Sequence, residues 1–342
     1  MGFVVRTRAE GEVTSLRTLL SDLPLADEAS RDAVHERAAT ILRPSGALAW
    51  LDEIAAWVAA WQRTSTPRVE RPAGLIFAAD HGIATATEVS AYPTGVTRAM
   101  LSAYEEGRST ITAFARLAGA TVTAIDVGVG QPTNDIRYES AMSPERFDEI
   151  VDTAMGAVDQ LDCDLLVLGE MGIGNTTASA AIAASLAGGE TAAWVGRGTG
   201  VDDEGLARKR SAVQESVRRI AGVTDPLEIL REVGGSEIVA ITAATVAARR
   251  RSIPVVLDGY VVTAAVLPLH EIDAASLDHC TVGHCSAEPG HRKLLERLGK
   301  APLLDLDMRL GEGSGAMAAV PLIAMACAGI TDVPTFAEWF DE

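Results

Sequence analysis

One carboxylate in this chain stands in a turn that is suited to close approach by a ligand. Glu312 lies between Gly311 and Gly313, shortly after the apolar stretch 302–308, which is typical of a buried strand. Glycines on both sides allow the backbone to fold tightly and to come near a bound molecule. Open α/β sheets bind their ligands at the carboxyl ends of parallel strands. We therefore predict that Glu312 acts as a general base.

A second motif is suited to an anion. The segment 169–177 (GEMGIGNTT) follows an apolar stretch and precedes an Ala-rich helix expected over 177–187. Backbone N–H groups at a helix start are free to bind a phosphate, although the Walker A lysine and the dinucleotide glycine spacing are absent. The candidate phosphate-binding residues of this segment are Gly174, Asn175, Thr176 and Thr177.

A third motif, 196–200 (GRGTG), precedes a helical segment that carries Lys209. By itself, either glycine loop is equally consistent with a tight turn that caps a helix. Lys209 is also consistent with a solvated basic face, because arginines flank it. On one rim together, the two loops favour a phosphorylated ligand. The candidates here are Gly198, Thr199, Gly200 and Lys209.

The segment 77–97 adds polar residues at another strand end. Asp80 is a candidate hydrogen-bond acceptor for a sugar, whereas we interpret His81 as a structural histidine. The 234–238 segment (GGSEI) is interpreted as a glycine turn with a serine cap at a helix start. His284, Ser286 and His291 do not form an evident nucleophile triad, and G-x-S-x-G is absent.

The elements that must position these residues follow an alternating pattern. Near-continuous apolar runs that end in Asp, Gly or Glu alternate with Ala-rich helical segments, which predicts a parallel sheet covered on both faces. We expect an α/β fold with a doubly wound, mainly parallel sheet of about six strands. The runs are 75–80, 122–128, 165–171, 254–259, 279–284 and 302–308.

The first 70 residues show helical periodicity without strand-like alternation. Trp50, Trp57 and Trp61 share one face of a helix expected over 47–63. We interpret this face as packing against the main domain or a partner subunit. The charged segment that contains Pro67 marks the boundary to the α/β part.

Composition excludes several classes of partner. The net charge is -18, with 47 acidic and 29 basic residues, which argues against nucleic acid and anionic membranes. The beginning of the chain lacks the apolar segment of a signal peptide. The longest apolar run, 316–330, is shorter than a membrane span and is interpreted as a buried core helix.

The four cysteines have no spacing that indicates a disulfide framework, so we expect a reducing cytoplasm. Cys280 and Cys285, with His279 and His284, raise the hypothesis of a zinc site. Their spacing is not one of the usual ligand patterns, and we favour a strand that runs into a loop.

Taken together, the motifs carry a family resemblance. The chain resembles the nicotinate-nucleotide–dimethylbenzimidazole phosphoribosyltransferase family, whose members serve assembly of the cobalamin lower ligand. The matching stretches run in the family's order from residue 79 to residue 316, and the last is the most specific. They are 79–97, 169–177, 196–209, 234–244, 254–265 and 283–316.

The resemblance implies transfer of phosphoribose from nicotinate mononucleotide to 5,6-dimethylbenzimidazole, which gives α-ribazole 5'-phosphate and nicotinate. It implies Glu312 as the catalytic base and Glu170 as a carboxylate that stabilises positive charge on the ribosyl ring. The acceptor base would lie near Ser90, Tyr92 and Pro93. No metal or redox cofactor is implied.

The resemblance also implies a domain organisation and an assembly. A small helical domain (1–70) is completed by about 326–342, and a large Rossmann-like domain spans 71–325. Homodimers are typical of the family. The chain departs from the family pattern at 102–111, where Arg108 and Ser109 replace small residues, and at 131–140.

Two alternatives remain open from the sequence. A related phosphoribosyltransferase could use another azole, a purine or a phenol as acceptor, with the same phosphate loops and a different acceptor pocket. A non-catalytic subunit that binds a nucleotide or a base would keep the loops but would have no need for Glu312.

Overall fold

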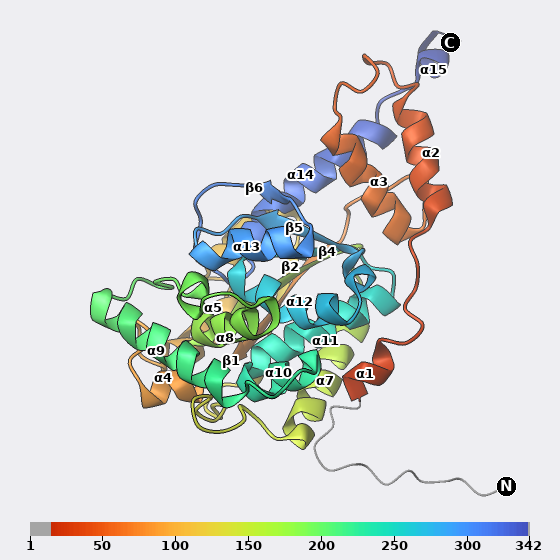
Figure 1. Ribbon diagram of the computed structural model, residues 1–342. Coiled ribbons are helices and arrows are strands. Elements are labelled where there is room, and N and C mark those ends of the chain that lie inside the picture. Colours follow the sequence, from red (N-terminus) through yellow and green to blue (C-terminus); the bar gives the residue numbers. More distant parts are fainter. Residues whose placement is uncertain (1–14, 341–342) are drawn as a thin grey trace, which may run out of the picture.

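The structure is a computed structural model that describes residues 15–340 of the chain. A six-stranded parallel sheet lies at its centre, with strands in the order β2-β1-β3-β4-β5-β6 (Figure 1). The strands coincide with the six apolar runs, so the expected α/β fold is confirmed. They are β1 (Pro72–Ala79), β2 (Thr121–Gly128), β3 (Leu165–Met171), β4 (Val255–Leu257), β5 (Cys280–His284) and β6 (Pro302–Leu304).

Burial on both faces explains why the strands read as continuous apolar runs. All residues of β1 are buried, and alternate side chains enter opposite cores. Leu75 and Phe77 belong to one core, while Ile76 belongs to the other. Since successive side chains of a strand point to opposite faces, a strand with helices on both sides must be apolar throughout.

Helices cover both faces of this sheet. The core on one face includes α7 (Pro144–Asp159), α8 (Asn175–Ala187), α10 (Pro226–Val233), α11 (Ser236–Arg250), α12 (Tyr260–Ile272) and α13 (Pro289–Leu298). The core on the other face includes α5 (Val96–Glu105), α6 (Thr110–Ala118) and α14 (Ser314–Thr331). The remaining elements of this part are α4 (Gly82–Ala86), α9 (Asp203–Arg219) and the 3-10 helices η1 (Thr191–Trp194) and η2 (Ala274–Leu277).

Local signals in the sequence fix several helix starts. The Ser143 side chain accepts a hydrogen bond from the Arg146 N–H at 3.2 Å, and a proline follows it at the start of α7. Asp225 caps α10 in the same way and is also followed by a proline. A side-chain oxygen satisfies N–H groups that have no partner in the helix, and proline is tolerated at the first helical position.

Segments from the N-terminal and C-terminal parts of the described chain meet in a small helical lobe. It contains α2 (Glu28–Ala38), α3 (Trp50–Gln62), the last turns of α14 and α15 (Phe336–Phe340), and it projects from the large part (Figure 1). Backbone hydrogen bonds of 2.9 Å join the 40–42 segment to the 334–336 segment. Helix α1 (Ser15–Leu19) lies elsewhere, because Leu16 is buried in the core that contains α7.

Two of the three tryptophans of α3 anchor the lobe to the large part. The indole N–H groups of Trp57 and Trp61 both donate to the Asp278 carbonyl, at 3.2 and 3.1 Å. Trp61 is completely buried, whereas Trp50 remains 51% exposed. The expected packing against the main domain is therefore present at one end of this face and not at the other.

The expected length of the last apolar segment was wrong. Helix α14 comprises 18 residues, Ser314–Thr331, none of them charged, so by length and composition it could cross a membrane. It contains Pro321, and most of it is buried against β3, β5, α3 and α6. Burial inside the protein accounts for its composition, as expected of a core helix.

Candidate active site

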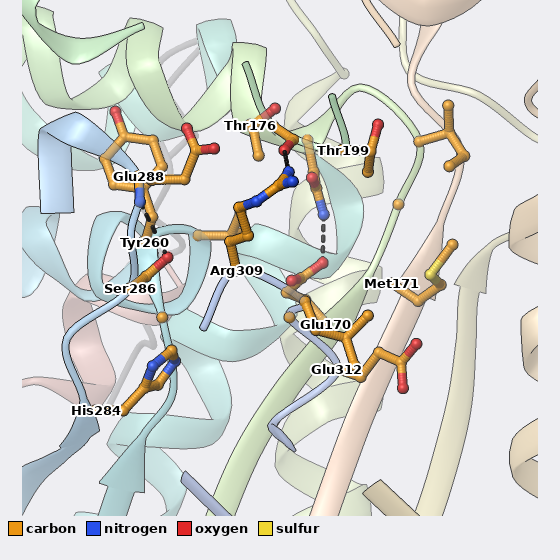
Figure 2. A pocket seen from close by; sticks show the side chains of 18 residues that line it. Glu170, Met171, Thr176, Thr199, Tyr260, His284, Ser286, Glu288, Arg309 and Glu312 are labelled. Atoms are coloured by element: carbon orange, nitrogen blue, oxygen red, sulfur yellow. Dashed lines mark hydrogen bonds between the residues drawn. The ribbon is translucent and has the colours of Figure 1, made fainter. Parts of the chain in front are cut away.

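A pocket opens at the carboxyl ends of β3, β4 and β5, beside the 309–312 loop (Figure 2). The pocket is partly open to solvent, and both polar and apolar side chains line it. The predicted residues that line it are Glu170, Asn175, Thr176, Gly198, Thr199 and Glu312. Segments far apart in the sequence thus meet at one site.

The turn around Glu312 is strained and tied to the sheet. Gly311, Glu312 and Gly313 have φ angles of 86°, 66° and 84°, so three consecutive residues adopt the left-handed region. For glutamate this conformation costs about 1–2 kcal/mol. The Asp258 carboxylate accepts hydrogen bonds from the Gly313 N–H (3.1 Å) and from the Ala316 N–H (2.9 Å). Asp258 therefore ties the turn and the start of α14 to the end of β4.

Burial adjusts the acidity of Glu312. The side chain is only 7% exposed, and its Oε2 atom has no hydrogen-bond partner among the described residues. Burial, and next the charge of Asp258, raise the pKa of Glu312 to about 7. A carboxyl group with such a pKa can take up a proton near neutral pH, as a general base must.

Glu170 lines the same pocket from the carboxyl end of β3. It is buried, and the Asn175 side-chain amide donates a hydrogen bond to it. Burial and the charges of Glu237 and Asp258 raise the pKa of Glu170 well above its ordinary value, while Asn175 opposes this shift. Burial therefore favours the protonated form of Glu170, and a cationic group beside it would favour the ionised form.

Lys209 connects the two glycine loops. Its side chain is 1% exposed, so the interpretation as a solvated basic face is wrong. The ammonium group donates a hydrogen bond of 3.0 Å to the Thr176 hydroxyl. A Cβ atom on Gly198 would lie only 3.0 Å from the same nitrogen. Burial lowers the pKa of Lys209 to about 8, and the charge of Glu288 opposes this shift.

Other loop residues support the site without lining it. Gly174 begins α8 with a φ angle of 99°, which favours glycine. Thr177 is completely buried inside α8. Gly200 lines a neighbouring groove and not the pocket that contains Glu312.

The residues expected near the acceptor base lie in adjoining surface features. Ser90, Tyr92 and Pro93 line the same groove as Gly200, and the Ser90 hydroxyl is 3.4 Å from the Thr199 hydroxyl. This groove therefore borders the pocket at Thr199 but does not include Glu170 or Glu312.

Asp80 lines a third depression together with Arg98. Its carboxylate accepts a hydrogen bond of 2.7 Å from the Gly130 N–H. The structure does not bring Asp80 to the pocket that contains Glu312.

The structure adds lining residues that the sequence interpretation missed. Tyr260, Glu288 and Arg309 face the pocket, and Figure 2 shows Arg309 between the Glu288 side and the Glu170 side. Arg309 donates a hydrogen bond of 3.1 Å to the Gly198 carbonyl. The signal was present, because Glu288 and Arg309 stand in the same motif-rich stretch as Glu312. Glu288 was interpreted only as a residue that shapes a loop.

Neither departure from the family pattern lines this pocket, although Tyr104 of the 102–111 segment lies near Glu312 and Glu170. Arg108 is exposed and lies 3.4 Å from Glu106, while Ser109 caps α6. In the other segment, Ser140 donates a hydrogen bond of 2.6 Å to Glu232. Both segments were expected near the substrate rim, but neither lines the pocket with Glu312.

The region of the zinc hypothesis is occupied by packing contacts. The His279 ring lies 2.9 Å from the Thr245 carbonyl, and burial lowers the pKa of this histidine to about 3. Within residues 15–340, no three His, Cys, Asp or Glu side chains are grouped closely enough to hold a metal ion. All four cysteines are buried and free.

Comparison with known proteins shows the family of this chain. A profile of the family described as phosphoribosyltransferase matches residues 23–339. The nicotinate-nucleotide–dimethylbenzimidazole phosphoribosyltransferase of Methylocella silvestris is 48% identical over 325 residues, which cover 95% of each chain. The chain belongs to this phosphoribosyltransferase family.

Other members agree in sequence and in structure. The enzyme of the same name from Methylorubrum extorquens is 44% identical over 317 residues, 92% of each chain. The crystal structure of the enzyme from Thermus thermophilus matches with a TM-score of 0.86 at 38% identity, and it covers 92% of this chain and 99% of that one. The phosphoribosyltransferase fold thus extends over almost the whole described chain.

Proposed function

We propose that this phosphoribosyltransferase transfers phosphoribose from nicotinate mononucleotide to 5,6-dimethylbenzimidazole, for the cobalamin lower ligand. The observation that carries the proposal is the Glu312 carboxylate, held in a strained turn with a pKa of about 7 and facing a pocket built from two glycine loops. The names of the relatives support the identity of both substrates.

Glu312 performs the proton transfer. Its carboxylate takes the N–H proton of the acceptor imidazole, and the other ring nitrogen attacks the anomeric carbon of the ribose. The bond from that carbon to the nicotinate nitrogen breaks, and its electron pair leaves with nicotinate. Attack from the opposite face converts the β donor into the α product.

Glu170 stabilises the charge that develops on the sugar. As nicotinate departs, positive charge grows on the ribosyl ring, and a nearby positive charge lowers the pKa of a carboxyl group. In its ionised form Glu170 stabilises that charge, while Asn175 holds the carboxylate in place.

The glycine loops bind the phosphate of the donor. The Thr176 and Thr199 hydroxyls, at the start of α8 and in the 198–200 turn, face an anion from two sides. The positive charge of Lys209 lies behind Thr176, and the Arg309 guanidinium group lines the pocket. The acceptor enters from the adjoining groove that contains Ser90, Tyr92 and Pro93.

A product assay tests this function. The purified protein is mixed with nicotinate mononucleotide and with dimethylbenzimidazole, benzimidazole, adenine or p-cresol, and chromatography measures nicotinate and the α-ribotide. Preferred turnover of dimethylbenzimidazole is expected. Preference for another acceptor would assign the chain to a related reaction, and donor binding without any turnover would assign it to a non-catalytic role.

We also propose a cytoplasmic homodimer. The small lobe leaves large apolar side chains at the surface, which is unfavourable for a monomer. They are Trp50, Met325, Phe336, Trp339 and Phe340. Sedimentation equilibrium should give twice the chain mass, and a Trp339→Ser, Phe340→Ser variant should shift the equilibrium toward the monomer. A wild-type monomer at micromolar concentration contradicts the proposal.

A further inference from the structure

A buried pair of side chains lies behind the pocket and has no part in the proposed chemistry. His81 Nε2 and Glu237 Oε1 are 2.6 Å apart, and both side chains are fully buried. His81 follows β1, and Glu237 lies in the first turn of α11. Neither residue lines the pocket. The contact therefore fastens two distant elements beneath the site.

Two glycines make room for this pair. A Cβ atom on Gly172 would lie 2.8 Å from Glu237 Oε1 and 3.0 Å from His81 Nε2. A Cβ atom on Gly235 would collide with the His81 ring and would lie 2.7 Å from Glu237 Oε2. The pair thus leaves no room for a side chain at Gly172 in the 171–174 loop, which lines the pocket.

The charge of Glu237, one member of the pair, acts on Glu170. The groups that face Glu170 are Glu237 from α11, Asp258 after β4, Glu312 before α14, Tyr104 from α5 and the Asn175 amide. Burial is the largest cause of the raised pKa of Glu170, and the charge of Glu237 is the second largest. His81 Nε2 lies 2.6 Å from Oε1 of this same Glu237 side chain.

We propose that the His81–Glu237 pair is a positioning device for Glu170, because it supports the 171–174 loop from behind and fixes the charge that this carboxylate faces. The inference rests on the role proposed above for Glu170. His81 and Glu237 act through the loop and touch neither substrate. A small displacement of a reacting group, about 1 Å, is enough to reduce turnover by about 100-fold.

Two substitutions test the proposal with opposite expected signs. Glu237→Gln keeps the shape of the side chain and removes its charge, so the pKa of Glu170, followed by NMR of its labelled carboxyl carbon, should fall. His81→Gln removes the imidazole that lies 2.6 Å from Glu237 Oε1, so the pKa of Glu170 should rise. In both variants kcat at the optimum falls, up to about 100-fold, with a smaller change in KM for dimethylbenzimidazole.

Thr242→Val is the matched control. Thr242 is buried on the same helix and donates to the carbonyls of Ile238 (2.9 Å) and Ala265 (2.7 Å), away from the loop. This variant should lose stability and keep the Glu170 pKa of the wild type. If one of the variants Glu237→Gln and His81→Gln does not fold, the direction of the shift in the other variant tests the proposal.

An unmoved pKa of Glu170, or shifts in the same direction in both variants, overturns the proposal and leaves the pair as a packing contact. Glu170→Gln separates this result from the role of Glu170: full activity in that variant contradicts the charge-stabilising role itself. Absence of product from the wild-type protein contradicts the proposed function instead.

Discussion

The ammonium group of Lys209 lies 3.0 Å from the hydroxyl of Thr176 and thereby joins the two glycine loops of the site. Thr176 belongs to the first turn of α8, whereas Lys209 comes from α9. Burying a lysine without a carboxylate at hydrogen-bond distance is costly, which its lowered pKa reflects. A bound phosphate would supply the missing negative charge.

Lys209→Met should weaken donor binding. Since a hydrogen bond to a charged group contributes about 1.5–3 kcal/mol, KM for nicotinate mononucleotide should rise about 10- to 100-fold, with little change in KM for the acceptor. In the wild type, donor affinity should decline above pH 8, because Lys209 has a pKa of about 8 and loses its charge there. The Met variant should lack this decline. Arg210→Met, which removes an exposed cation from the same helix, should behave like the wild type.

Glu312→Gln should lower kcat by orders of magnitude while donor binding remains. In the wild type, kcat should fall below about pH 7, because protonated Glu312 cannot accept the acceptor's proton. Steady-state kinetics across the pH range on both sides of this value, and donor titration by calorimetry, measure the two effects. Turnover near the wild-type level would remove Glu312 from the base role.

The same substitution should increase stability at high pH. The pKa of Glu312 is raised by folding, so the stability due to its protonated form is fully present below the ordinary value of 4.5 and is lost as pH rises through about 7. Glutamine carries no charge and avoids this loss. Denaturant unfolding at a pH above that range should therefore show Glu312→Gln to be more stable than the wild type, and equal or lower stability would contradict the assigned pKa.

Gly169→Ala should disturb the Glu312 turn. A Cβ atom there would lie 2.5 Å from the Glu312 carbonyl oxygen and 2.8 Å from the Gly313 nitrogen. Such overpacking costs about 1–3 kcal/mol, and displacement of the turn should reduce kcat as well. Gly156→Ala is the control, since nothing lies within 4 Å of its Cβ position in α7. It should gain about 0.5–1 kcal/mol and keep full activity. Normal activity in Gly169→Ala would show that the turn tolerates the shift.

Tyr104→Phe should leave stability unchanged or raise it by about 1 kcal/mol. The Tyr104 hydroxyl is buried without a hydrogen-bond partner among the described residues, and burial followed by the charges of Glu312 and Glu170 raises its pKa. Removing a buried hydroxyl that lacks a partner removes a desolvation penalty. Thermal and denaturant unfolding measure the change, and a clear loss of stability would reveal a partner in solution.

Much of the fold could be predicted because its signals are local. Buried parallel strands must be apolar on both faces, so the runs at 165–171 and 279–284 identified β3 and β5 directly. Glycines on either side of Glu312 indicated a tight turn, and the structure has one there. The length of α14 was underestimated, because its uncharged stretch begins earlier than the apolar run suggested.

The sequence by itself determined the strands, the glycine loops, Glu312 and the family resemblance, because each depends on residues adjacent in the chain. Only the tertiary structure decided which strand ends share a pocket. Asp80 follows a strand just as Glu170 ends one, yet Asp80 turns to Gly130, while His81 is buried against Glu237. It also decided that Lys209 is buried and that Glu312 has a pKa of about 7. Burial and charge proximity arise from contacts between distant segments, and no local pattern encodes them.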